Sequence, residues 1–411
     1  MEHTGNRNER RIIDRFPQGI VTPPPSKSLS HRALICAALA SLSEGGSAQS
    51  GGTGAGIKNL GVSEDIRATE QGIARVVAVL LGLSDDRRID CGESGSTLRF
   101  LIPLAGLAGG EWAFTGRGKL PERPIDVYRA IFAARGGLCE RRGAEIYVRG
   151  RLTPGRYVLR GDVSSQFLSG LLFALPLMDG DSEIALTSSL ESSDYVRMTA
   201  GTMRRYGVET ESSGGAGYRV RGRQVYRRAP YTVEADYSQA AFFLAAAALG
   251  RDVRVAGLRR DSVQGDRRIL EILDRMGTAV SCDPDGAIRV RPPEDGLRAL
   301  TLDMSETPDL VPPVAALACY CKGRTRIVNA GRLRLKESDR LRALGTELRK
   351  LGAAVRETDD GLLFDGAESL RGGTADAWGD HRVAMAAAVA AIGCREPVEL
   401  SGWAHVRKSY P

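Results

Sequence analysis

The stretch Ser26-Lys27-Ser28-Leu29-Ser30-His31-Arg32, which runs directly into the Ala- and Leu-rich segment 33–40, is the first of six similar junctions that together decide the fold. At each junction a short polar tract meets a long apolar segment of helical composition. The six tracts are spaced by 67, 70, 74, 71 and 72 residues when they are anchored at Lys27, Ser94, Ser164, Ser238, Asp309 and His381. Such even spacing predicts a repeated structural unit.

Each junction has the features of a helix start. Small Ser and Asp side chains are the preferred caps for the backbone N–H groups of a first helical turn. The helix dipole places its positive end at the same point, so such a start favours bound anions. Six of these starts in one chain predict a substrate that carries several negative charges.

Between the junctions the sequence alternates a second kind of helix with short strands. Five amphipathic segments end on Gly, and in the last of them Leu341, Leu344 and Leu348 share one helical face. Short β-rich runs such as Glu183-Ile184-Ala185-Leu186 separate the helices. The pattern predicts an α/β fold built from units of βαβαββ order, with the first helix of each unit buried. The five amphipathic segments are 63–82, 124–137, 193–207, 265–277 and 337–352.

Six units predict two domains of three units each. We expect an N-terminal domain at 21–234 and a C-terminal domain made of 1–20 and 235–411. The starts of the buried helices would lie on one rim of each domain, and the two rims would enclose an anion site in a cleft that closes on its ligands. The sixth unit is incomplete, because the sequence reaches Pro411 where a second helix would begin, and we interpret the chain as a truncated form.

Composition narrows the class of protein. The formal charge of +7 is compatible with nucleic acid, anionic lipid or small acidic substrates, but no five consecutive residues are basic and aromatic residues make up only 6%. The longest apolar runs, 240–249 and 383–392, are about half as long as a bilayer-spanning helix. Seven cysteines without a C-x-x-C pair indicate packing in a reducing compartment. We expect a cytoplasmic monomer that binds no nucleic acid, membrane, metal or cofactor.

The tract 41–56 is rich in Gly and lacks apolar periodicity, so it predicts a surface loop. A phosphate-cradling loop is the alternative. No Gly-Lys-Ser/Thr follows the tract, which disfavours that alternative.

Seven ordered tracts resemble those of the 5-enolpyruvylshikimate-3-phosphate (EPSP) synthase family, and the resemblance covers nearly the whole chain from about Ile20. It implies the fold expected above, with two domains of three βαβαββ units each, arranged as inside-out α/β barrels whose helix starts face the interdomain cleft. The tracts are Pro25-Ser26-Lys27-Ser28, continuing to Ser30-His31-Arg32, then Gly92-Glu93-Ser94-Gly95-Ser96-Thr97 with Arg99, Leu120-Pro121-Glu122-Arg123-Pro124, Gly161-Asp162-Val163-Ser164-Ser165-Gln166, Pro308-Asp309, Leu335-Lys336-Glu337-Ser338-Asp339-Arg340 and Gly379-Asp380-His381-Arg382.

The resemblance implies a reaction of the shikimate pathway of aromatic amino-acid biosynthesis. The 5-hydroxyl of shikimate 3-phosphate attacks C2 of phosphoenolpyruvate, C3 is protonated, and the tetrahedral intermediate loses phosphate. Both substrates carry a phosphate and a carboxylate, which agrees with the charge demand of the helix starts. The chemistry needs a base, an acid and cations that hold the departing phosphate.

The resemblance also implies which residues act. Three would be catalytic: Asp309 as the base at the 5-hydroxyl, with Glu337 and Lys27 as candidates for proton delivery to C3. Residues that would bind phosphoenolpyruvate are Lys27, Gly95, Arg123, Gln166, Arg340, Arg382 and Lys408. Residues that would bind shikimate 3-phosphate are Lys27, Ser28, Arg32, Ser164, Ser165, Gln166, Ser192, Tyr195, Asp309 and Lys336. Arg forks suit carboxylates and phosphates, and Gly95 lets the backbone approach the bound enolpyruvate.

Simpler interpretations exist for single tracts. Ser164 to Gln166 can be an ordinary helix cap, and Asp309 can be a first-turn acid that serves the helix dipole. Glu337 and Arg340 can form a solvated ion pair, and His381 is more often structural than catalytic. The joint order of the tracts at the repeat period favours the functional interpretation.

Departures from the family pattern leave alternatives open. Arg332 stands where some members have an Asn that contacts the phosphorylated ring, and the chain end raises the question of whether Lys408 is held in place. The first alternative is a UDP-N-acetylglucosamine enolpyruvyltransferase, although the segment 116–124 lacks the Cys that such enzymes carry. A catalytically inactive homologue and a non-catalytic RNA-binding protein are the others.

Overall fold

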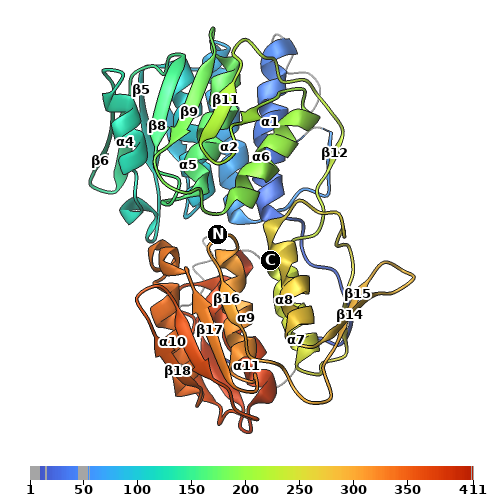
Figure 1. Cartoon of the computed structure of the whole chain (residues 1–411). Coiled ribbons are helices and arrows are strands. Elements are labelled where there is room, and N and C mark those ends of the chain that lie inside the picture. The colour runs from blue at the N-terminus through green and yellow to red at the C-terminus, as the bar shows by residue number, and fades with distance from the viewer. Residues whose placement is uncertain (1–9, 14–15, 45–53, 55, 409, 411) are drawn as a thin grey trace. The chain divides into compact units, whose positions relative to one another are not determined.

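The computed structural model describes residues 10–13, 16–44, 54, 56–408 and 410 (Figure 1). The chain forms two compact units, an N-terminal unit of residues 25–233 and a C-terminal unit of residues 1–24 with 234–411. The sequence placed the boundaries at 20/21 and 234/235. Residues 21–24 belong to the C-terminal unit because Val21 pairs with Val255 and the Pro24 carbonyl accepts a hydrogen bond from the Asp236 N–H (2.9 Å).

Two four-stranded sheets of the N-terminal unit have the expected βαβαββ connection. In each sheet the first two strands are parallel and the later strands are antiparallel. The first comprises β4 (Arg88–Asp90), α3 (Gly95–Ala108), β5 (Glu111–Thr115), α4 (Asp126–Ala133), β6 (Leu138–Arg142) and β7 (Glu145–Arg149). The second comprises β8 (Gly155–Leu159), α5 (Ser165–Ala174), β9 (Ser182–Leu186), α6 (Ser193–Arg205), β10 (Glu211–Ser212) and β11 (Gly217–Val220).

The remaining part of the N-terminal unit has a smaller sheet among the described residues. Helix α1 (Lys27–Ala40) and the 3-10 helix η1 (Ser41–Glu44) precede β3 (Ile57–Lys58), which is followed by α2 (Glu64–Leu80). Strand β3 pairs in parallel with β12 (Tyr231–Thr232). Residues 45–53 and 55 of the predicted loop 41–56 lie outside the described residues, whereas 41–44 are helical.

The C-terminal unit repeats the pattern and incorporates the N-terminal strands. One four-stranded sheet of this unit contains β16 (Thr301–Asp303), β17 (Arg324–Val328), β18 (Ala354–Glu357) and β19 (Leu362–Asp365). The helices between these strands are η5 (Pro308–Leu310), α9 (Val311–Ala318), η6 (Gly331–Leu335) and α10 (Arg340–Lys350). A second sheet takes its first strand from β2 (Gly19–Val21) and continues with α7 (Tyr237–Ala248), β13 (Val253–Val255), η4 (Gly265–Arg268), α8 (Ile269–Arg275), β14 (Ala279–Cys282) and β15 (Ile288–Arg291). A three-stranded sheet comprises β20 (Gly373–Asp376), α11 (His381–Ala390), β21 (Val398–Ser401) and β1 (Arg10–Ile13), and η7 (Ala391–Gly393) and η8 (Trp403–Lys408) complete the described elements.

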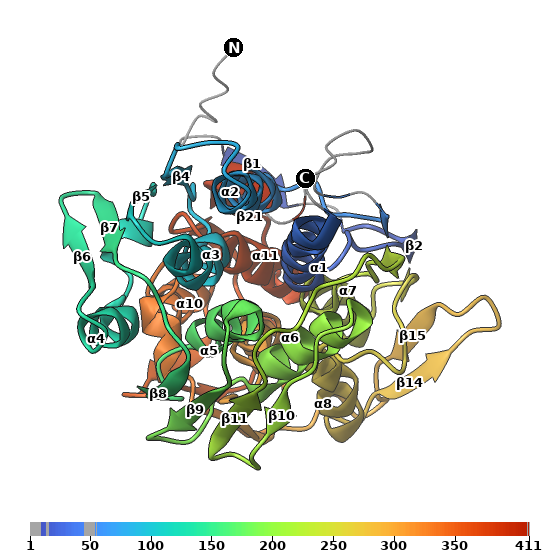
Figure 2. The same ribbon diagram turned by 90° about the horizontal axis from the view of Figure 1, so that it is seen from above.

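Buried helices form the centre of each unit, as the apolar segments predicted. Every residue of α7, α9 and α11 is buried in the C-terminal unit. In the N-terminal unit α1, α2, α3, α5 and α6 pack against one another in a ring (Figure 2). Gly170 permits the close approach of α5 to α3, because a Cβ atom there would lie 2.3 Å from the Arg99 carbonyl oxygen. This contact fixes the starts of α3 and α5 relative to each other.

Candidate active site

Five of the six predicted helix starts carry a side-chain cap. The caps are Ser26, Ser94, Ser164, Asp236 and Asp380, each of which accepts a hydrogen bond from a backbone N–H of the first turn. The sixth start differs, because Asp309 lies within the 3-10 helix η5 and the residue at its cap position, Thr307, makes no side-chain cap bond. The capping interpretation therefore applies to Ser164, and Asp309 is an acid in the first turn of η5.

Three cations surround the Asp309 carboxylate in the C-terminal unit. Arg340 Nη1 lies 3.1 Å from Asp309 Oδ1, and Arg382 Nη2 lies 3.1 Å from Oδ2. Lys336 Nζ lies 3.8 Å from Oδ1. The predicted residues Asp309, Lys336, Arg340 and Arg382 thus form one cluster, built from η5, the end of η6 and the starts of α10 and α11.

Arg340 is held in this cluster by two further carboxylates. Its Nη2 donates to Glu337 Oε2 at 2.6 Å, and its Nε donates to Asp380 Oδ2 at 2.7 Å. Because the Arg340 side chain is only 2% exposed, the Glu337–Arg340 pair is not the solvated pair that the sequence left open. Asp380 also accepts from Ser338 Oγ (3.1 Å) and caps α11, so it joins the starts of two helices.

Charge controls the ionisation of the cluster. Burial raises the pKa of Asp309, but the positive charges of Arg382, Lys336 and Arg340 outweigh it and hold this pKa well below its usual range. Burial lowers the pKa of Lys336 to about 8, against the opposing effect of Asp309. At neutral pH Asp309 is therefore a carboxylate, and Lys336 is an ammonium close to its titration range.

A buried acid that the sequence analysis missed lies at the start of α7. Ser238 Oγ donates a hydrogen bond to Asp266 Oδ2, and Asp266 is 3% exposed. Burial and the charge of Asp309 raise the pKa of Asp266 to about 7, although Arg382 opposes the shift. The signal in the sequence is the tract Gln264-Gly265-Asp266, which opens the amphipathic segment 265–277.

In the N-terminal unit Lys27 is paired with an acid that the sequence analysis did not select. Its Nζ donates to Asp65 Oδ2 at 2.9 Å, from the first turn of α1 to the first turn of α2. A buried chain of hydroxyls lies beside this pair, in which Thr97 Oγ1 contacts both Thr69 Oγ1 (2.6 Å) and Ser94 Oγ (2.8 Å). The starts of α1, α2 and α3 are therefore tied together by polar contacts.

Gly95, Arg123 and Gln166, which the resemblance assigns to phosphoenolpyruvate, lie close to one another. Arg99 Nη1 donates to Gln166 Oε1 (2.7 Å), and Gln166 Nε2 donates to Ser96 Oγ (3.0 Å). A Cβ atom on Gly95 would lie 2.6 Å from Arg123 Nη1 and 3.5 Å from Gln166 Oε1. The Arg123 guanidinium therefore lies directly against the Gly95 backbone. Arg99 is a further arginine beside Gln166.

Arg32 is largely engaged by the protein itself. It donates to the Ser28 carbonyl (2.7 Å), the Tyr195 carbonyl (2.9 Å) and Thr199 Oγ1 (2.8 Å). Burial lowers its pKa to about 10, which still leaves it charged at neutral pH. Arg32 therefore joins the start of α1 to α6, where the predicted residue Ser192 precedes the first turn with a left-handed φ of 54°.

For the other predicted residues the structure gives a position and few contacts. Ser164 and Ser165 begin α5, and Ser165 is buried. Lys408 ends η8, and its side chain lies outside the described residues. Arg332 donates to the Ser305 carbonyl oxygen, and His381 is buried at the start of α11.

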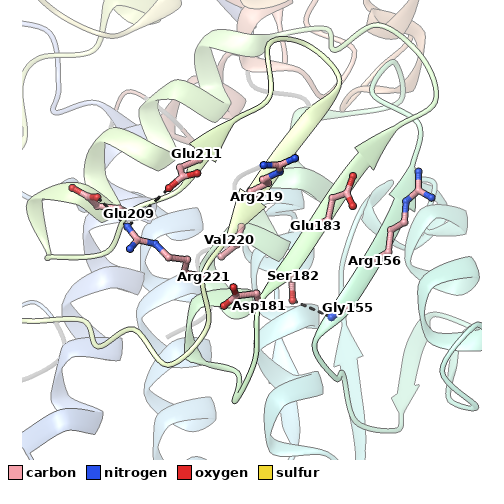
Figure 3. A pocket seen from close by; sticks show the side chains of 10 residues that line it. All are labelled: Gly155, Arg156, Asp181, Ser182, Glu183, Glu209, Glu211, Arg219, Val220 and Arg221. Atoms are coloured by element: carbon pink, nitrogen blue, oxygen red, sulfur yellow. Dashed lines mark hydrogen bonds and ion pairs between the residues drawn. The ribbon is translucent and has the colours of Figure 1, made fainter.

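The hollow drawn in Figure 3 contains none of the predicted site residues. It lies on the sheet of β8, β9, β10 and β11, and charged side chains such as Arg156, Glu183 and Arg219 line it. Arg221 approaches Glu209 and Glu211 at only 3.8 Å and 4.0 Å, and all three side chains are more than 60% exposed. Exposed pairs of this kind contribute little free energy. Because none of the predicted site residues lines the hollow, we do not take it as the candidate active site.

In the part of the chain that the structure describes, no group of three or more His, Cys, Asp or Glu residues could hold a metal ion. No described helix is both long enough and apolar enough to cross a membrane.

Solved structures define the class to which this fold belongs. The chain superimposes on EPSP synthase from Acinetobacter baumannii with a TM-score of 0.73, 22% identity and coverage of 96% of this chain and 93% of that chain. It superimposes on the enolpyruvyl transferase NikO from Streptomyces tendae with a TM-score of 0.70, 16% identity and coverage of 98% and 94%. The fold is therefore the two-domain α/β fold of the enolpyruvyl transferases, as predicted.

Sequence comparison identifies the family. The family model of EPSP synthase (3-phosphoshikimate 1-carboxyvinyltransferase) matches residues 15–411. The chain is 42% identical to the 3-phosphoshikimate 1-carboxyvinyltransferase of Clostridium novyi over 98% of this chain and 94% of that protein, and 43% identical to that of Clostridium kluyveri over 96% and 93%. The chain belongs to the EPSP synthase family, which confirms the resemblance in the seven tracts and does not favour the sugar-nucleotide alternative.

Proposed function

We propose that this chain transfers the enolpyruvyl group of phosphoenolpyruvate to the 5-hydroxyl of shikimate 3-phosphate and releases phosphate. The observation that carries the proposal is the cluster in which Arg340, Arg382 and Lys336 surround Asp309. Such a cluster combines a carboxylate that can accept a proton with cations that attract anionic substrates. The family membership supports the same reaction. We further propose that the enzyme works in the cytoplasm as a monomer.

The resemblance supplies the residues that we propose for phosphoenolpyruvate. Arg340 and Arg382 present guanidinium forks suited to its carboxylate. Lys27 and Arg123, with the amide of Gln166 and the bare backbone at Gly95, would take its phosphate, and the resemblance adds Lys408. Gln166 is already oriented by Arg99 and Ser96 at 2.7 Å and 3.0 Å, which supports a preorganised amide.

Shikimate 3-phosphate would be held by hydroxyl and amino groups at the starts of α1, α5 and α6 and by Lys336. Because Ser26 and Ser164 already cap α1 and α5, their neighbours Ser28 and Ser165 present hydroxyls beside the positive ends of these helices. Arg32 would contribute its charge while it remains bonded to Ser28 and Tyr195. The full set proposed here is Lys27, Ser28, Arg32, Ser164, Ser165, Gln166, Ser192, Tyr195, Asp309 and Lys336.

The base function of Asp309 depends on a change in its neighbours. With Arg340 and Arg382 paired to it, the low pKa of Asp309 makes it a weak base. When a substrate carboxylate takes over these two arginines, part of their charge is neutralised and the pKa of Asp309 rises. Asp309 would therefore become a better base only when phosphoenolpyruvate is bound.

The reaction balances with groups of this chain. Asp309 takes the proton of the 5-hydroxyl, the hydroxyl oxygen bonds to C2, and Glu337 or Lys27 supplies a proton to C3. As phosphate leaves C2, the same acid takes a proton back from C3, which restores the double bond. The proton on Asp309 leaves with the phosphate. Glu337 Oε2 lies 2.6 Å from Arg340 Nη2, and Lys27 Nζ lies 2.9 Å from Asp65 Oδ2. Each candidate acid is therefore held in place by a partner of opposite charge.

Acceptor preference tests the proposal. Purified protein is mixed with phosphoenolpyruvate and either shikimate 3-phosphate or UDP-N-acetylglucosamine, and inorganic phosphate is measured. We expect release only with shikimate 3-phosphate. Release only with the sugar nucleotide would establish the other transferase reaction, and no release with either acceptor would indicate an inactive homologue.

A further inference from the structure

Glu347 is a buried carboxylate outside the cluster described above. It lies on α10, two turns after Arg340, and is 1% exposed. Its Oε1 accepts a hydrogen bond from the indole Nε1 of Trp378 at 2.7 Å, and its Oε2 accepts one from the backbone N–H of Asp376 at 2.9 Å. Lys350 Nζ, 2.9 Å away, balances the charge. A buried carboxylate with three partners fixes the groups that donate to it.

Trp378 occupies a backbone conformation that side chains other than glycine rarely adopt. Its φ is 53°, in the left-handed region, and it stands directly before Gly379. The Trp378 N–H donates to Asp376 Oδ1 at 2.6 Å, and the Ala377 N–H donates to the Ser401 carbonyl at 3.0 Å. Such a conformation persists only where surrounding contacts define it, and Glu347 provides the contact to the indole.

The turn 376–380 leads directly into Arg382, and its last residue, Asp380, contacts Arg340. The Asp380 N–H donates to the Ala377 carbonyl at 2.8 Å, which closes the turn. The Asp380 side chain then receives Arg340 Nε at 2.7 Å and the Arg382 N–H at 2.9 Å. A displacement of the turn would therefore move both arginines relative to Asp309.

We propose that Glu347 and Trp378 are positioning residues for phosphoenolpyruvate. The hydrogen bond between the Trp378 indole and the Glu347 carboxylate stabilises the turn 376–380. This turn orients the side chains of Arg340 and Arg382. The inference rests on the proposed function, because that function assigns the two arginines to the substrate carboxylate. Neither Glu347 nor Trp378 contacts the reacting atoms in this account.

Trp378→Phe tests this hydrogen bond with a small change. Phenylalanine keeps a smaller aromatic ring and removes the indole N–H, so the hydrogen bond to Glu347 is lost. We expect the KM for phosphoenolpyruvate to rise about five- to tenfold, as for the loss of one buried bond to a charged group. The KM for shikimate 3-phosphate and kcat should change less than about twofold. The reason is that the variant weakens phosphoenolpyruvate binding equally in the ground state and in the transition state.

A matched control and a second variant accompany this measurement. Trp112→Phe removes another indole N–H, which donates to the Gly109 carbonyl at 3.0 Å and lies outside the turn, and it should leave both KM values unchanged. Glu347→Gln keeps the size of the side chain but removes its charge, and it should raise the same KM as Trp378→Phe. If one of these variants fails to fold by circular dichroism, the other still provides the test.

The outcomes separate this inference from the function on which it rests. Arg382→Lys, which keeps the charge but loses the fork, serves as the reference. If Arg382→Lys raises the KM for phosphoenolpyruvate but neither Trp378→Phe nor Glu347→Gln does, the positioning role is wrong and the proposed function stands. If Arg382→Lys leaves that KM unchanged, the assignment of the arginines is wrong. Equal losses for both substrates in the Trp378 and Glu347 variants would indicate a merely structural role and overturn the proposal.

Discussion

Arg382 binds Asp309 through two separate groups, because its Nη2 lies 3.1 Å from Asp309 Oδ2 and its Nη1 lies 3.1 Å from the Asp309 backbone oxygen. The guanidinium therefore fixes both the side chain and the main chain of η5. This relationship joins the start of α9 to the start of α11. It places the proposed base and a proposed substrate-binding arginine in direct contact.

Asp309→Asn tests the base. The amide keeps the size of the side chain but cannot accept the hydroxyl proton, so kcat should fall by about 10²- to 10⁴-fold. Far-ultraviolet circular dichroism should remain unchanged, and shikimate 3-phosphate should still bind in calorimetry. A kcat within threefold of the unmodified protein would remove Asp309 from the catalytic set.

Lys27→Ala tests the proposed acid in the N-terminal unit. The substitution removes the ammonium that pairs with Asp65, and turnover should fall by orders of magnitude while the protein stays folded. Lys58→Ala is the control, because Lys58 lies in β3 in the same unit, outside the proposed site, and its turnover should match the unmodified protein. Equal activity of the two variants would contradict the assignment of Lys27.

The ionisation of Lys336 should make kcat/KM for shikimate 3-phosphate depend on pH. With a pKa of about 8 in the free protein, Lys336 loses its charge as the pH rises through that value. We expect kcat/KM for shikimate 3-phosphate to decline above pH 8, because an uncharged amine attracts the anion less. Lys336→Arg keeps its charge over this range, so its profile should be flatter. An identical decline in both proteins would assign the effect to another group.

The ionisation of Asp266 should make the free energy of unfolding depend on pH. Its folded-state pKa of about 7 lies above the value of about 3.9 expected for an unfolded chain, so the folded state binds the proton more tightly. This contribution to stability is fully present below the unfolded pKa and is lost as the pH rises through 7.

Urea unfolding of Asp266→Asn at pH 5.5 and pH 8.0 measures this effect. The midpoint of the unmodified protein should fall more between these pH values than that of the variant. Asp261→Asn, at an exposed position of the same unit, should behave like the unmodified protein. Parallel curves for Asp266→Asn and the unmodified protein would contradict the raised pKa.

Gly95→Ala tests the close approach at the start of α3. The new Cβ would meet Arg123 Nη1 at 2.6 Å, so the guanidinium must shift. We expect the KM for phosphoenolpyruvate to rise about tenfold and that for shikimate 3-phosphate to change little. Gly201→Ala on α6 is the control, since no atom lies within 4 Å of its Cβ position. Similar KM values for the two variants would show that Gly95 does not border the phosphoenolpyruvate site.

The repeat of polar tract and apolar helix predicted much of the fold, because a buried helix leaves a long apolar run and its start leaves a capping residue. The helices α1, α3, α5, α7 and α11 begin within two residues of their predicted anchors. The sequence assigned residues 1–20 to the C-terminal domain but did not predict the strands β1 and β2, since these short strands pair with partners more than 200 residues away. Pairing over such separations leaves no local pattern.

The site was predictable where a residue lies in an ordered tract. Asp309, Lys336, Arg340 and Arg382 come together because helix starts of one unit converge. Asp65, Asp266 and Glu347 were missed because each appears in the sequence as an ordinary acid in the first turn or on the face of an amphipathic helix. Only the packing of that helix against its neighbours makes each one a buried partner.

Phosphorus NMR of one reaction mixture tests the central claim most directly. Unmodified protein is added to equimolar phosphoenolpyruvate and shikimate 3-phosphate, and all phosphorus signals are followed with time. The account predicts that the phosphoenolpyruvate signal is replaced by inorganic phosphate, that a phosphate monoester persists on the ring, and that Asp309→Asn abolishes the change. An unchanged spectrum, or inorganic phosphate derived from shikimate 3-phosphate, would contradict the account.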